Sequence, residues 1–189
     1  MIQEFSLEMK KFVQDMMSDL HTIIPGVIDS FDADKCEAIA SPLGKFKKPD
    51  GSMIDYPKIY GVPVMFLQSA GQAATIVSPV KKGDFCLLLF SEQSLDLWRT
   101  DATSKTNLRY DLTNAIALVG LFSKPNPIVK EAIKKDAVII DRNGSRIILN
   151  PNNTIEIVGD TTIHGKLTVS DDVLFQKNLN VDGHSYINS

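Results

Sequence analysis

The sequence has few cysteines, no excess of positive charge and no long apolar run. Its two cysteines, Cys36 and Cys86, show no CxxC or Cys/His spacing, so we interpret them as small buried residues of a protein assembled in reducing cytoplasm. The net charge of −3 gives no electrostatic bias toward nucleic acid or anionic membranes. No stretch approaches the roughly 20 apolar residues of a membrane span. Because Glu4, Glu8 and Asp15 interrupt the N-terminus, we predict no signal peptide.

Catalytic motifs are also missing. The sequence contains no GxSxG, P-loop, HExxH or GxGxxG pattern. The adjacent carboxylates Asp171 and Asp172 point to opposite sides of an extended chain, whereas glycosidase carboxylates must flank one bond. His164 is either a solvated side chain or, in a threefold assembly, one of three that approach the axis and bind a metal or an anion. We predict that the protein is not an enzyme and has no catalytic residue, no cofactor and no metal site.

The last third of the sequence is a repeat. Four isoleucines recur at intervals of eight residues: Ile139, Ile147, Ile155 and Ile163. After Gly165 the interval shortens to six, in one apolar file of Leu167, Val173 and Leu179 and a second of Val169, Phe175, Val181 and Ile187. Turn-forming residues such as Asn143-Gly144 and Gly159-Asp160 separate the apolar pairs. Short strands in an array of fixed period predict a β-helix or β-solenoid.

One copy of this array cannot enclose a core. A strand with one apolar face and open edges is unstable alone and pairs with other chains. We therefore predict a homotrimer in which three chains wind about one axis. A two-chain or single-chain solenoid is the alternative, although single-chain coils need roughly twenty residues or more per turn. The predicted trimer core comprises Ile139, Ile147, Leu149, Ile155, Ile157, Ile163, Leu167, Val169, Val173, Phe175, Leu179, Val181 and Ile187.

The N-terminal residues 2–20 predict one amphipathic helix. Phe5, Met9, Phe12 and Met16 recur at helical spacing, with acids and lysines opposite them. This stripe either packs on its own domain or docks on a partner subunit, because Met and Phe side chains adapt to imperfect surfaces. Insertion into a membrane surface is the weakest alternative, because the polar face is not predominantly basic.

Residues 21–122 have the pattern of a compact β domain. Strands are expected near 22–31, 36–41, 59–68, 85–90 and 115–122, with a hairpin turn at 32–35, a polar loop at 46–57 and a short helix at 94–98. The run 85–90 is apolar at every position and predicts a strand buried on both faces. About five strands with one short helix are typical of a Greek-key barrel of the OB type. A linker follows at 123–136, where 128–135 can form a helix, and the array occupies 137–189.

Four segments carry a resemblance to a known family. They are HTIIPGVIDSFD at 21–32, DYPKIYGVPVMF at 55–66, KKGDFCLLLFSEQSLDLW at 81–98 and DLTNAIALVGL at 111–121. In this order, followed by the repeats, they resemble the OB domain and shaft of the central spike proteins of contractile phage tails and related injection systems. The resemblance implies a mainly β homotrimer that docks on baseplate hub or tube proteins, with a triple-stranded β-helix that pierces the host envelope. It also implies a virion component assembled in the host bacterial cytoplasm.

The end of the chain departs from that family. Many such spikes end in a His-x-His pair whose three copies hold iron, whereas His184 is followed by Ser185 and Tyr186. We therefore predict no apical iron, and expect either a separate tip protein that caps the shaft or a truncated chain.

Two rival functions stay open. OB barrels often bind single-stranded nucleic acid, and Lys45, Lys47 and Lys48 surround Phe46 in one loop. The acidic net charge argues against this alternative, and we predict no nucleic-acid partner. The second rival is a β-helical adhesin that binds surface glycan.

Overall fold

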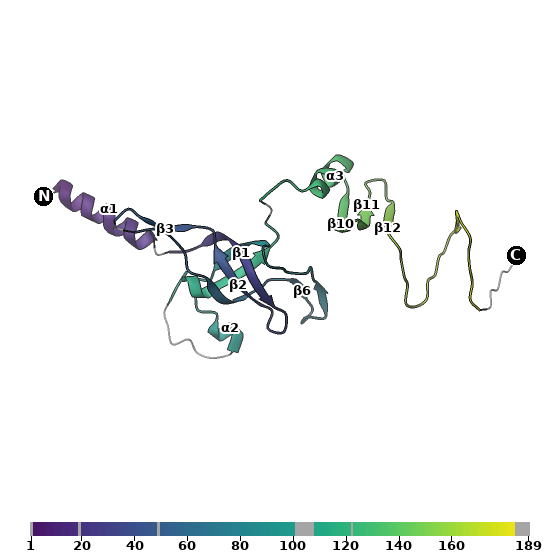
Figure 1. The fold of residues 1–189 in the computed structure, drawn as a ribbon, viewed down its shortest axis with the longest axis horizontal. Helices are drawn as coiled ribbons and strands as arrows, with labels where there is room; N and C mark the ends of the chain where they lie inside the picture. The colour runs from purple at the N-terminus through teal and green to yellow at the C-terminus, as the bar shows by residue number, and fades with distance from the viewer. Residues whose placement is uncertain (1, 19, 49, 101–107, 122, 184–189) are drawn as a thin grey trace. The chain divides into compact units, whose positions relative to one another are not determined.

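The computed structural model describes residues 2–18, 20–48, 50–100, 108–121 and 123–183. It divides into two compact units, Met1–Pro125 and Asn126–Ser189, which are described separately. The first begins with the expected amphipathic helix, α1 (Ile2–Ser18) (Figure 1). None of the described helices is both long and apolar enough to cross a lipid bilayer.

The centre of the first unit is a five-stranded antiparallel sheet. Its strands are β1 (Ile23–Asp32), β2 (Glu37–Pro42), β5 (Ile59–Pro63), β8 (Phe85–Phe90) and β9 (Ala115–Val119), in the spatial order β5-β2-β1-β8-β9. The expected turn joins β1 to β2, and the Asp32 carboxylate accepts hydrogen bonds there from the backbone N–H groups of Asp34 (3.0 Å) and Lys35 (3.3 Å). The five main strands were therefore expected from the sequence, although β5 ends at Pro63 and β9 at Val119, before the expected ends at 68 and 122.

The two edges of this sheet meet. Val64, directly after β5, forms a parallel bridge with Ala117 of β9, and the Met65 N–H donates to the Ala117 carbonyl at 2.9 Å. The sheet therefore curls until its first and last strands are neighbours. This arrangement removes part of the exposed edge that an open sheet would present.

The core lies inside the curled sheet. Its fully buried members include Ile28, Val62, Cys86 and Leu88. In β8, Cys86, Leu88 and Phe90 are buried, whereas the residues between them are only half-buried, which corrects the prediction of a strand buried on both faces. The reason is that only one face of the curled sheet points inward.

Shorter elements surround the sheet. The segment expected to be a loop at 46–57 contains part of a hairpin of β3 (Lys45–Lys47) and β4 (Met53–Asp55), so that prediction was wrong. A second hairpin pairs β6 (Leu67–Ser69) with β7 (Ala74–Ile76). The expected short helix is α2 (Asp96–Thr100), with the Ser94 hydroxyl accepting from the Asp96 N–H at 3.2 Å, and a 3-10 turn, η1 (Leu112–Asn114), precedes β9.

The second unit begins with α3 (Pro127–Lys135), which agrees with the helix expected over 128–135. A three-stranded antiparallel sheet follows, in the order β10 (Val138–Arg142), β11 (Ser145–Leu149) and β12 (Ile155–Val158). From 159 to 183 the single chain forms no helix or strand, although the sequence predicts short strands there (Figure 1). A strand needs a partner for its backbone groups, and this segment of one chain has none within the part described.

Candidate assembly surfaces

The sheet of the second unit has one covered and one uncovered face. Residues directly opposite each other in an antiparallel pair share a face. Ile140 lies opposite Ile147, and Ile147 lies opposite Ile157. The set on this side, which we name the open face, consists of Val138, Ile140, Ile147, Leu149, Ile155 and Ile157, all between 42% and 67% exposed. Six neighbouring aliphatic side chains therefore face outward.

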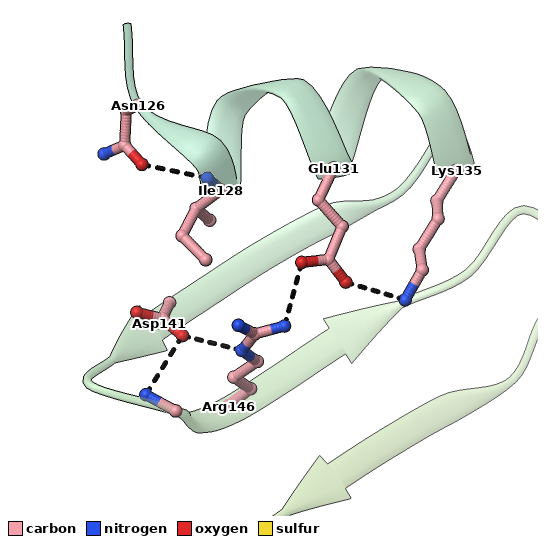
Figure 2. A network of polar contacts seen from close by, with 7 residues as sticks. Asn126, Ile128, Glu131, Lys135, Asp141 and Arg146 are labelled. Carbon is pink, nitrogen blue, oxygen red and sulfur yellow. Dashed lines mark hydrogen bonds and ion pairs between the residues drawn. The ribbon is translucent and has the colours of Figure 1, made fainter. Parts of the chain in front are cut away.

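The opposite face, which we name the covered face, lies beneath α3 over β10 and β11, whereas its β12 residue Val158 is 44% exposed. Ile139 pairs with Ile148 on this side, and Ile148 is only 2% exposed. Figure 2 shows α3 over the strands, with Ile128 and Glu131 directed toward the sheet. The side chain of Asn126 caps the helix by accepting from the Ile128 N–H at 2.9 Å. Pro at the first helical position also favours this start.

A polar network connects α3 to the covered face (Figure 2). The Arg146 guanidinium donates from Nη1 to Glu131 at 2.9 Å and from Nε to Asp141 at 2.7 Å. Lys135 contacts the other oxygen of Glu131 at 2.8 Å, and the Gly144 N–H donates to Asp141 at 3.3 Å. Every charge in this group therefore has an opposite charge beside it.

These contacts shift the acidities of the network. The Lys135 hydrogen bond is the largest cause that lowers the pKa of Glu131, and the Arg146 charge acts in the same direction. The hydrogen bond to Asp141, followed by the charge of Glu131, raises the pKa of Arg146. Both groups are thus held in their charged forms by the fold.

The register of the sheet is set by the turn Asn143-Gly144. Both residues have positive φ, 52° and 94°, as the two-residue hairpin turn that matches the strand twist requires. Arg142 and Ser145 are therefore directly paired, and the pairing of all the following residues is determined.

The predicted trimer-core residues divide on this sheet. Ile147, Leu149, Ile155 and Ile157 all belong to the open face. Ile139 lies on the covered face, which corrects the expectation that it shares a file with Ile147. Sequence reasoning missed Val138 and Ile140, which take its place, and the alternation of Val138 with Ile140 was the signal that could have identified them.

The remaining residues of the predicted trimer core come after β12 in the sequence. Ile163, Leu167, Val169, Val173, Phe175, Leu179 and Val181 are exposed and lie outside any strand. Ile187 lies outside the described residues. The single chain therefore brings none of these seven side chains into a core of its own.

The four residues predicted to dock a partner, Phe5, Met9, Phe12 and Met16, are all exposed on α1. This helix is therefore a second apolar surface, separate in sequence from the open face.

The basic segment behind the nucleic-acid alternative forms one strand of the β3–β4 hairpin. Lys45 contacts Asp55 at 3.2 Å, and Phe46 packs edge-on against Tyr56 with ring centroids 6.4 Å apart. One of the lysines thus already has an acidic partner, and the aromatic ring contacts another ring of the same unit. Across the described part of the chain, no three His, Cys, Asp or Glu side chains are grouped to hold a metal ion.

Comparison with known proteins identifies the family of the first unit. The family described as "Phage protein Gp138 N-terminal domain" matches residues 24–120, slightly more than half of the chain. The chain belongs to this family. The Gp138 N-terminal domain covers the curled sheet from β1 to the end of β9, and the match supports a structural phage protein of the tail or baseplate type and a virion component. No curated protein matches the chain significantly.

Proposed function

We propose that this chain is the trimeric central spike of a contractile phage tail, without enzymatic activity. The observation that carries the proposal is the open face. Six neighbouring aliphatic side chains on one face of a small sheet are exposed, and the two polar strand residues of this face, Arg142 and Ser145, lie at its end beside the turn. Patches of this kind mark sites of association. Burying one such side chain contributes about 1.5–3 kcal/mol, so a shared core would be strongly favoured.

The segment after β12 supports three chains over two. Two sheets stacked on their open faces would bury Ile147 and Ile157, but would provide no backbone partner for residues 159–183. Three chains wound about one axis provide both an interior for the apolar files and hydrogen-bonding neighbours for each short strand. The repeat of six residues in this segment also fits one layer of such a shaft for each repeat.

The first unit supports the same proposal. Its strand order, with the segment after β5 bridged to β9, fits a Greek-key barrel of the OB type. The barrel carries exposed apolar residues such as Leu67 and Ile76, which face each other across the β6–β7 hairpin. In the proposed spike this unit docks on hub or tube proteins above, and a separate tip protein is a further candidate partner at the other end.

The proposed action is mechanical. A narrow shaft with its apolar side chains inside and its backbone fully paired can enter a lipid layer without unfolding, because no backbone group is left unsatisfied in hydrocarbon. Contraction of the sheath would supply the force at the host envelope.

Light scattering on the purified chain tests the proposal. The expected mass is three times the chain mass of 20.9 kDa. A stable monomer at micromolar concentration would overturn the shaft. Tight, salt-dependent binding of single-stranded DNA to the barrel would favour the nucleic-acid alternative, and retention on glycan would favour the adhesin.

A further inference from the structure

The apolar stripe of α1 has the spacing of a coiled coil. Phe5, Met9, Phe12 and Met16 are separated by four, three and four residues, which is the alternation of d and a positions in a heptad. All four are exposed, and Val13 widens the stripe on one side at an e position. Leu7, also exposed, occupies an f position on the opposite side of the helix. A seam with a mean interval of 3.5 residues fits another helix better than a flat sheet.

The described part of the chain offers α1 no helix of matching length. Its other helical elements are α2, which has five residues, η1, which has three, and α3, whose inner side packs on β10 and contacts Arg146 of β11. The partner of the stripe must therefore come from another chain, and a second copy always carries a stripe of identical period.

We propose that α1 pairs with the α1 helices of two other copies in a parallel three-stranded coiled coil. The inference rests on the trimer proposed above, since closed threefold symmetry brings the same ends of three chains together. Met9 then meets Met9 in one layer and Phe12 meets Phe12 in the next. The apolar stripe is thus taken up within the spike, and hub docking falls to the barrel surface.

The flanking residues suit a parallel arrangement. In parallel coiled coils a g residue of one helix approaches the following e residue of its neighbour. Here Glu8 at g would approach Val13 at e, so no like charges oppose each other.

The length of α1 makes its pairing depend on the rest of the assembly. At 17 residues, α1 is little longer than the roughly 12–15 residues below which even Ala-rich isolated helices are marginal in water. Three copies held in one trimer by the open face have a high effective local concentration, which favours pairing without new contacts. The test therefore needs the full chain.

Cysteine cross-linking provides that test. In a Cys36→Ser background, Met9→Cys places a thiol in the proposed seam and Leu7→Cys places it on the outside of the same helix. Mild oxidation with copper phenanthroline is expected to link chains through Met9→Cys. Leu7→Cys should react at least roughly tenfold more slowly, because outward thiols lie far beyond the ~4 Å Cβ separation of a disulfide.

Light scattering on both variants separates the outcomes. Trimers with linkage through Met9→Cys alone support the coiled coil. Trimers that link equally through both positions, or through neither, overturn it and leave the proposed spike trimer intact. Monomers without linkage overturn the coiled coil and the spike trimer together.

Discussion

Arg146 of β11 contacts Glu131 of α3 at 2.9 Å, on the face of the sheet opposite Ile147. The contact ties the helix to one side of the strands and satisfies the charges there. The other side carries the six aliphatic residues of the open face, with Arg142 and Ser145 at its end beside the turn. One chain thus buries side chains on one face of this sheet and leaves the aliphatic side chains of the other face exposed.

The first prediction concerns the open face. Ile157→Asp would place three carboxylates in one layer of the proposed trimer, and unpaired buried charge is very costly. We expect this variant to be monomeric by native mass spectrometry while the barrel stays folded.

Val158→Asp is the matched control for this variant. Val158 is the next residue in β12, pairs with Arg146 and belongs to the covered face, where a carboxylate has a cation nearby. We expect it to remain trimeric. Equal effects of the two substitutions would show that the two faces do not differ in assembly.

The second prediction concerns pH. Because the pKa of Glu131 is lowered in the folded chain, its contribution to stability is present above its ordinary value of 4.5 and is lost as the pH falls through the lowered value. The melting temperature of the second unit should therefore fall below about pH 4.5. Glu131→Gln should have a lower melting temperature at neutral pH, and that temperature should change less as the pH falls. A pH profile identical to that of the unsubstituted chain would contradict this role.

The third prediction concerns the core of the curled sheet. A Cβ at Gly26 would lie 2.7 Å from Leu88 Cδ1, and Leu88 is fully buried. Gly26→Ala should lower the free energy of unfolding by about 1–3 kcal/mol through overpacking, and Leu88→Ala by about 2–5 kcal/mol through a cavity. Denaturant unfolding of the double variant should show a loss smaller than the two single losses combined. Strict additivity would mean that the two sites are not in contact.

The fourth prediction concerns the thiols. Burial raises the pKa of Cys86 to about 11, whereas Cys36 is exposed at a turn. Since the thiolate is the reactive form, a maleimide at about pH 8 should label Cys36 and spare Cys86. Cys36→Ser should then be unlabelled until denaturant is added. Rapid labelling of this variant in native buffer would contradict the burial of Cys86.

The five main strands were predictable from the sequence because short runs rich in apolar and β-branched residues, such as 85–90, are bounded by turn-forming residues. The β3–β4 hairpin was missed for the converse reason. Each of its strands has only three residues, too few to show an alternation, and charged residues such as Lys45 and Asp55 make the segment look like a polar loop. The parallel bridge of Val64 to Ala117 joins distant segments and has no local signature either.

The candidate surface was only partly predictable. A repeat of eight residues identified Ile147 and Ile155 as equivalent, and both belong to the open face. The same repeat wrongly grouped Ile139 with Ile147. The two-residue turn between β10 and β11 pairs Ile139 with Ile148, which lies on the covered face. The cover supplied by α3 on one side could not be foreseen, since the helix precedes the repeat and contributes only Ile128 and Ala132 as half-buried apolar residues.

The turn Asn143-Gly144 has a consequence for how this protein can vary. Inserting or deleting a single residue there, with β11 keeping its place beside β10, would exchange the two sides of that strand. Ile147 and Leu149 would then lie on the face beneath α3, and Arg146 would lie on the open face. An odd change in the length of this turn would thus move every side chain of β11 to the other face at once, whereas a substitution changes one side chain.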